Sequence, residues 1–195
     1  MGLTLITGPA LEPVTVVEAK AHLRETGDDN DGQIAGYILA ARQGAEDFCR
    51  RKLYTQTWDF TLDGDWPLVK INGEYRQRII LPLPPLQSVT HVKYYDTAGV
   101  EQTLASNQYR VDPTSYEGRI DPAYGVTWPV VRDQMATITV RMVVGYSALP
   151  EPVRQAILLT VGHFYSNRES VIVGTSAMEL PQAAQALLFP YRSFY

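Results

Sequence analysis

Hydrophobic residues recur at helical spacing in three stretches of the chain, each long enough for several turns of an amphipathic helix. A fourth, shorter helix is indicated by Thr15 and Glu18, which fit a capping box, and it should continue to about Arg24. The apolar stripes are Ile34, Tyr37, Ile38, Ala41, Ala45, Phe48, Cys49 and Leu53; Val153, Ala156, Ile157, Thr160, Val161 and Phe164; and Leu180, Ala183, Ala184, Leu187, Leu188 and Tyr191.

Between these helices the hydrophobic period changes from 3.6 to 2, which is typical of half-buried strands. The clearest alternation covers residues 58–62 and 138–146, and shorter strands are expected at 79–81, 89–95, 100–104 and 109–111. Residues 96–99, with glycine last, fit the loop of a β-hairpin. Tyr94 and Tyr95 just before it should point to opposite faces of their strand, so we interpret this tip as a turn rather than an active site. It remains available for contact with another protein.

The order of these elements predicts an α+β fold. We expect residues 1–54 and 147–195 to form an antiparallel bundle of about four helices, and residues 55–146 to form an antiparallel β-rich module inserted into it. Residues 171–179 have no clear period, and we expect a mobile loop there.

Composition narrows the class of protein. The chain has 195 residues, 45% of them hydrophobic, and a formal net charge of -4. Binding to duplex DNA through phosphates needs a clustered basic surface, but the longest basic run is Arg50, Arg51 and Lys52 at an expected helix end, where cations complement the helix dipole. There is no apolar run of the roughly 18 residues that span a membrane and no secretory signal pattern. We therefore expect a soluble, intracellular protein.

The sequence contains no recognisable catalytic, cofactor-binding or metal-binding motif. Asp28, Asp29 and Asp31 resemble a calcium loop, but the glycine of the segment is one position early and the final glutamate is missing, so helix capping is the favoured interpretation. His22, His91 and His163 are isolated from one another in sequence. Cys49, the single cysteine, lies on an apolar stripe and is expected to be a core residue. An enzyme acting on nucleic acid or cell wall would need an acidic or metal cluster that this pattern lacks.

The end of the chain is rich in aromatic side chains and arginine, which are favoured at the centres of protein interfaces. Two interpretations stay open: this segment docks onto a partner, or it folds back onto the helices of its own chain. The candidate partner-binding residues are Phe189, Pro190, Tyr191, Arg192, Phe194 and Tyr195.

Taken in order, several segments resemble the head-tail connector, or adaptor, family of long-tailed bacteriophages and gene transfer agents. The segments are EPVTVVEAKAHLR, ILAARQGAEDFCRRKLYTQTWDFTLD, LPLPPLQSVTHVKYYDTAG, YRVD, WP, VRMVVGY, LPEPVRQAILLTVGHFYSNRE and LPQAAQALLFPYR. The resemblance spans nearly the whole chain, and it depends on the ordered set rather than on any one segment.

The resemblance implies a structural protein without cofactors or catalytic residues. Members form a ring, commonly of twelve copies, beneath the portal protein, join it to a tail-side connector, stopper or tail terminator protein, and line the passage for DNA. The C-terminal residues listed above would bind the portal, and the outer helices with residues 167–179 would form subunit contacts. The implied location is the neck of a virion, after assembly in the host cytoplasm. The alternative is a stand-alone cytoplasmic protein-binding module or another phage assembly factor.

Overall fold

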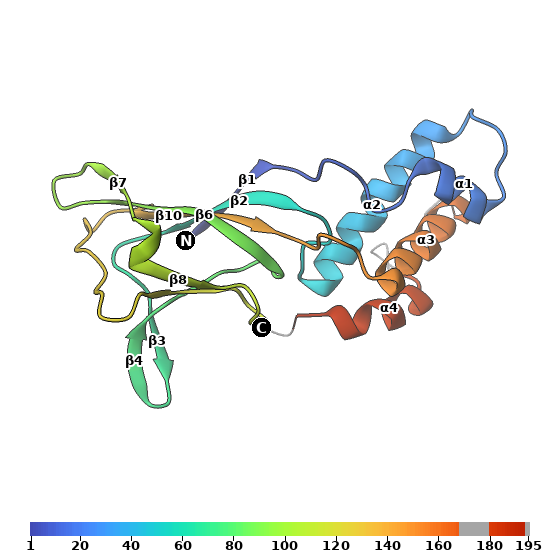
Figure 1. The fold of residues 1–195 in the computed structure, drawn as a ribbon. Coiled ribbons are helices and arrows are strands. Elements are labelled where there is room, and N and C mark those ends of the chain that lie inside the picture. Colours follow the sequence, from blue (N-terminus) through green and yellow to red (C-terminus); the bar gives the residue numbers. More distant parts are fainter. Residues whose placement is uncertain (168–179, 194–195) are drawn as a thin grey trace, which may run out of the picture. The chain divides into compact units, whose positions relative to one another are not determined.

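The computed structural model describes residues 1–167 and 180–193, and the chain divides into two compact units. The β-rich unit contains residues 1–9 and 55–146, and the helical unit contains residues 10–54 and 147–195. The described residues form four α-helices and antiparallel sheets, which confirms the predicted α+β class. Figure 1 shows the elements of each unit.

The helical unit contains α1 (Val16–Leu23), α2 (Asp31–Cys49), α3 (Glu151–Ser166) and α4 (Gln182–Leu188). The capping box predicted at Thr15 and Glu18 is present, and α1 ends at Arg24 in the left-handed region. Most residues of the predicted stripes form the core, whereas Ala183 is exposed and the aromatic members are half-buried. The buried members include Ile34, Ile38, Ala41, Ala45, Val153, Ala156, Ile157, Val161, Ala184 and Leu188.

The acidic turn before α2 differs from the prediction. Asn30 is the N-cap residue, and its side chain makes no capping hydrogen bond. Asp28 and Asp31 instead lie 2.6 and 2.8 Å from the amino group of Lys20 on α1. The expectation of carboxylate capping was therefore wrong, because an ammonium group brought close by the tertiary fold competes for the same oxygens.

The β-rich unit is built on a five-stranded antiparallel sheet in the order β1-β2-β10-β6-β7. Its strands are β1 (Gly2–Thr7), β2 (Gln56–Leu62), β10 (Ile138–Val144), β6 (Leu86–Tyr95) and β7 (Glu101–Thr103). A second sheet has the order β5-β9-β8, formed by β5 (Ile79–Ile80), β9 (Arg119–Pro122) and β8 (Tyr109–Asp112). Strands β3 (Leu68–Ile71) and β4 (Glu74–Gln77) make a separate hairpin.

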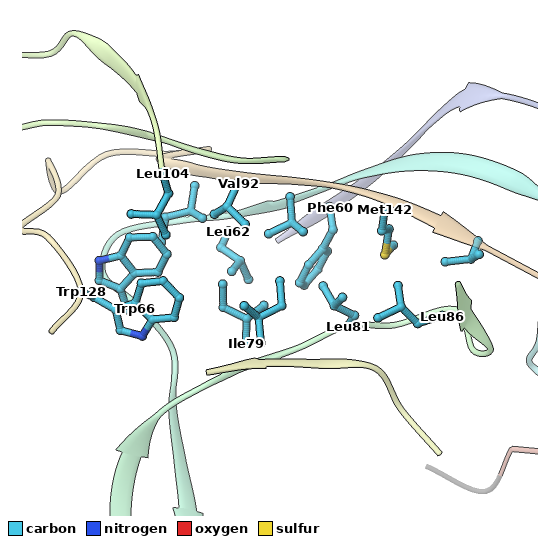
Figure 2. Close-up of a cluster of buried hydrophobic side chains, with 14 residues drawn as sticks. Phe60, Leu62, Trp66, Ile79, Leu81, Leu86, Val92, Leu104, Trp128 and Met142 are labelled. Carbon is cyan, nitrogen blue, oxygen red and sulfur yellow. The ribbon is translucent and has the colours of Figure 1, made fainter. Parts of the chain in front are cut away.

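The hydrophobic core of this unit lies between the two sheets. Alternate residues of β2 and β10 are buried, as the period of 2 predicts, and Figure 2 shows side chains of both sheets pointing toward one another. Trp66 and Trp128 stack at one end of this core with ring centroids 4.3 Å apart. The cluster contains Phe60, Leu62, Trp66, Ile79, Leu81, Leu86, Val92, Leu104, Ile120, Trp128, Ile138, Val140, Met142 and Val144.

Several elements were absent from the sequence prediction: β1, the β3–β4 hairpin and β9. All are short, and β1 and the hairpin bury few side chains, so their hydrophobic pattern is weak. The last predicted helix is also shorter, with α4 ending at Leu188 and a 3₁₀ turn, η2, over Phe189–Tyr191. Another 3₁₀ turn, η1, covers Ser106–Gln108. The loop expected at residues 171–179 lies outside the described residues.

Candidate functional site

The C-terminal segment rests against the end of α2. Leu188 is fully buried, and its carbonyl oxygen lies 3.8 Å from the Cys49 sulfur atom. The backbone amide of Ser193 donates a 2.7 Å hydrogen bond to the carbonyl oxygen of Cys49. Since a helix leaves its last carbonyl groups unpaired within the helix, this hydrogen bond satisfies one of them and fixes the segment in place.

The predicted partner-binding residues differ in their exposure to solvent. Phe189 is 55% exposed, and Pro190 is also exposed. Tyr191 and Arg192 are half-buried, and the Arg192 guanidinium lies over the ring of Phe48. Phe194 and Tyr195 lie outside the described residues. Of the two interpretations left open by the sequence, folding back thus describes residues 191–193, whereas Phe189 and Pro190 present an apolar surface to solvent.

Cys49 supports this segment and is not a reactive group. Burial is the main influence on the thiol and raises its pKa to about 11, while the positive charges of Arg51 and Arg192 act in the opposite direction. The protonated thiol is the unreactive form. The structure therefore agrees with the interpretation of Cys49 as a core residue.

Buried charged side chains of α2 form an ion-pair cluster that links the end of this helix to the residues before and after it. The Arg42 Nε donates a 2.7 Å hydrogen bond to Glu12, and Glu46 accepts from the Lys52 ammonium group at 3.0 Å and from the Leu53 amide at 3.1 Å. Arg42 and Glu46 are 6% and 5% exposed. This cluster was not predicted from the sequence. The available signal was the i, i+4 spacing of Arg42 and Glu46 beside the apolar stripe.

The tip of the β6–β7 hairpin is a turn, as the sequence predicted. The Asp96 carboxylate accepts hydrogen bonds from the backbone amides of Ala98 and Val100 and from the Gln102 side chain. These hydrogen bonds, led by that of Gln102, hold the pKa of Asp96 below its ordinary value. Tyr94 packs toward the core, with its ring centroid 6.1 Å from that of Trp66. The Asp96 carboxylate therefore shapes the loop.

The described residues contain no group of three or more His, Cys, Asp or Glu side chains that could hold a metal ion. Two of the three acidic residues that resembled a calcium loop, Asp28 and Asp31, are engaged with Lys20. In the same part of the chain, none of the helices is both long and apolar enough to cross a membrane.

Comparison with known proteins identifies the family to which the chain belongs. The model of the phage gp6-like head-tail connector proteins matches residues 13–123, which is more than half of the chain. The chain belongs to the phage gp6-like head-tail connector family. This confirms the resemblance found in the sequence and the functional class of a structural head-tail connector. No curated protein matches the chain by sequence.

Solved structures similar to this connector come from gene transfer agent particles. One chain, from the virion of a native particle, is 25% identical with a TM-score of 0.75. Two others, from the neck of an empty particle computed with C6 symmetry and the neck of a native particle computed with C12 symmetry, are 24% identical with TM-scores of 0.78 and 0.75. Each comparison covers 100% of this chain and 97% of the other, so both units have counterparts in one chain.

Proposed function

We propose that this connector forms a ring in the neck of a phage or phage-like particle, between the portal protein and a tail-side connector, stopper or tail terminator protein. The observation that carries the proposal is the match to the head-tail connector family, supported by full-length similarity to chains of gene transfer agent particles. In this proposal the protein is synthesised and assembled in the host cytoplasm and then forms part of the virion.

The ring would contain twelve copies. One of the similar structures is a neck computed with C12 symmetry, and another neck was computed with C6 symmetry. A ring needs heterologous contacts, in which one surface of a subunit meets a different surface of its neighbour, and a rotation that closes. The outer helices and residues 167–179 are proposed to contribute to these contacts.

Within the subunit, we propose that the helices act as the connector scaffold, as an antiparallel bundle that carries the β-rich module as an insertion between its two chain segments. The proposed role requires no catalysis and no cofactor. DNA passes through the ring without sequence-specific binding, and the net charge of -4 suits this role, because extensive phosphate contacts would slow the passage of DNA.

The portal contact is proposed at the C-terminal segment, centred on Phe189 and Pro190. The fully buried Leu188 anchors the backbone next to Phe189, whose side chain is 55% exposed. Such preorganisation lowers the entropy cost of association. Tyr191 and Arg192 support this surface from the side of α2, and Phe194 and Tyr195 are proposed to extend it.

Cryo-electron microscopy of the particle neck tests the proposal. The expected result is a ring of this chain between portal and tail, with the density at Phe189 and Pro190 in contact with the portal. A neck that lacks this chain would refute the proposed function. A ring whose portal contact is made by other residues would refute only the assignment of the C-terminal surface.

A further inference from the structure

An open apolar groove lies in the β-rich unit beside strand β1. Its volume is about 490 Å³, and its walls are formed mainly by aliphatic, proline and aromatic side chains. Two charged side chains, Arg78 and Glu117, also line the groove, and Arg78 is already bound to Asp121 through a bidentate ion pair. The apolar lining includes Leu3 and Phe60.

The groove exists because the second sheet does not cover the β1 edge of the first. In the strand register, Leu3 lies opposite Phe60 and Leu5 lies opposite Trp58. Phe60 is buried in the core between the sheets, so Leu3 and Leu5 lie on the core-facing side of β1. Leu3 and Leu5 are nevertheless 42% and 47% exposed. The apolar inner face of the five-stranded sheet thus extends along β1, where the second sheet does not cover it.

Strand β1 is also an unprotected sheet edge. It pairs with β2 on one side and with no described strand on the other, and residues Gly2–Thr7 contain neither a charged side chain nor proline. Proteins usually shield such edges with charges, proline or very short strands. The opposite edge strand, β7, has these protections: it is three residues long, and Glu101 pairs with Lys93 across the strands. The contrast indicates that β1, unlike β7, is covered in the functional assembly.

We propose that strand β1 and its groove are the docking surface for a second copy of this chain, the neighbouring subunit of the ring. This inference rests on the proposed ring. A heterologous ring requires each subunit to carry two different complementary surfaces, and an apolar groove bordered by a free strand edge is suited to an extended apolar segment.

The chain itself carries a segment of that chemistry. In the connection between β9 and β10, Tyr124, Val130 and Met135 are 100%, 76% and 85% exposed. The proposed portal surface, by contrast, belongs to the helical unit. A second copy therefore accounts for both sets of exposed apolar side chains in the β-rich unit.

The first experiment compares two charge substitutions on the same strand. Leu5→Lys places an ammonium group on the groove side, and Thr4→Lys places the same charge on the other side of β1, where it lies opposite Asp59. Because an unpaired charge buried in an interface is costly, Leu5→Lys should lower incorporation into particle necks by more than about tenfold, with Thr4→Lys close to wild type. Equal incorporation of both variants would overturn the inference. Both free subunits should show the wild-type melting temperature, since both positions are solvent-exposed in the subunit.

The second experiment identifies the occupant. A photo-crosslinking phenylalanine analogue replaces Leu3, which lines the groove. Particles are then assembled with this variant as their only source of the chain. Irradiation followed by mass spectrometry should give crosslinks between two copies of this chain. Crosslinks to the portal or another protein, or none, would overturn the inference while the proposed function stands. If the wild-type chain is absent from the neck, the proposed function itself fails.

Discussion

The guanidinium carbon of Arg192 lies 5.1 Å from the centroid of the Phe48 ring, which joins the C-terminal segment to the last turn of α2. A cation over an aromatic ring is attracted by the ring's negative face. Together with the hydrogen bond from Ser193 to Cys49, this contact fixes residues 191–193 and leaves Phe189 at the surface. Residues 191–193 thus attach the C-terminal segment to α2, while Phe189 in the same segment is exposed to solvent.

We predict that Phe189→Ala weakens portal binding without destabilising the subunit. The ring is more than half exposed, so its truncation should change the free energy of unfolding by less than about 1 kcal/mol. A central aromatic anchor typically contributes more than about 1.4 kcal/mol to binding, so affinity should fall at least about tenfold. Binding is measured with immobilised portal protein. Gln182→Ala, at an exposed position of α4, is the control. Unchanged affinity of the Phe189 variant would contradict the prediction.

The buried carboxylate of Glu46 gives a second prediction. Glu46→Ala removes a buried carboxylate that pairs with Arg42 and Lys52 and accepts from the Leu53 amide, while Arg42 keeps its ion pair with Glu12. Removing one member of a buried ion-pair cluster typically costs about 3–5 kcal/mol. The helical circular dichroism signal should therefore melt at a clearly lower temperature. Asp47→Ala changes an exposed carboxylate on the same helix and should melt like wild type. Equal melting of the two variants would show that the cluster contributes nothing.

The chain's single thiol should be unreactive in the folded protein. Because burial raises the pKa of Cys49 to about 11, the thiolate is scarce at pH 8, and the surrounding side chains also block reagents. A coloured disulfide reagent should label no thiol in native protein and one thiol after denaturation. The variant Gln43→Cys, which adds a thiol at an exposed position of α2, should react within the mixing time at its new site alone. Rapid labelling of native wild-type protein would refute the assignment.

The ion pair between Asp59 and Arg141 predicts a pH dependence of stability. Two 2.8 Å hydrogen bonds from Arg141 are the main cause that lowers the pKa of Asp59 in the folded state. A lowered carboxyl pKa contributes stability above the unfolded value of about 3.9, and this contribution is lost as pH falls through the folded pKa. Asp59→Asn should therefore cost about 1–2 kcal/mol at pH 7 and progressively less below about pH 4.

Tryptophan fluorescence is suited to this measurement, because Trp58, Trp66 and Trp128 all lie in the β-rich unit. Asp133→Asn, an exposed position of the same unit, is the matched control. A difference between wild type and the Asp59 variant that stays constant from pH 7 to pH 3 would mean that the carboxylate charge is not the source of the stabilisation.

By itself, the sequence determined the helices α1 to α3, the strongly alternating strands β2 and β10, and the turn between β6 and β7. These elements have dense local signals: a capping box at Thr15, apolar residues at a regular period, and Gly99 at a left-handed turn position. The family was also recognisable from the ordered segments, since local patterns persist where overall identity is low. The sequence named the C-terminal residues as a candidate surface, which stays a prediction, but it did not indicate which of them pack against α2 and which are exposed.

The tertiary structure decided the features that depend on contacts between residues distant in sequence. Strand β1 exists because β2 accepts its hydrogen bonds, and its own residues carry no buried face. Asp28 and Asp31 bind Lys20, and Arg192 lies over Phe48, because folding brings these groups together. Exposure decides which of Phe189 to Arg192 is available to a partner. No local pattern encodes such contacts, because their energy depends on the distance between groups that the chain separates by many residues.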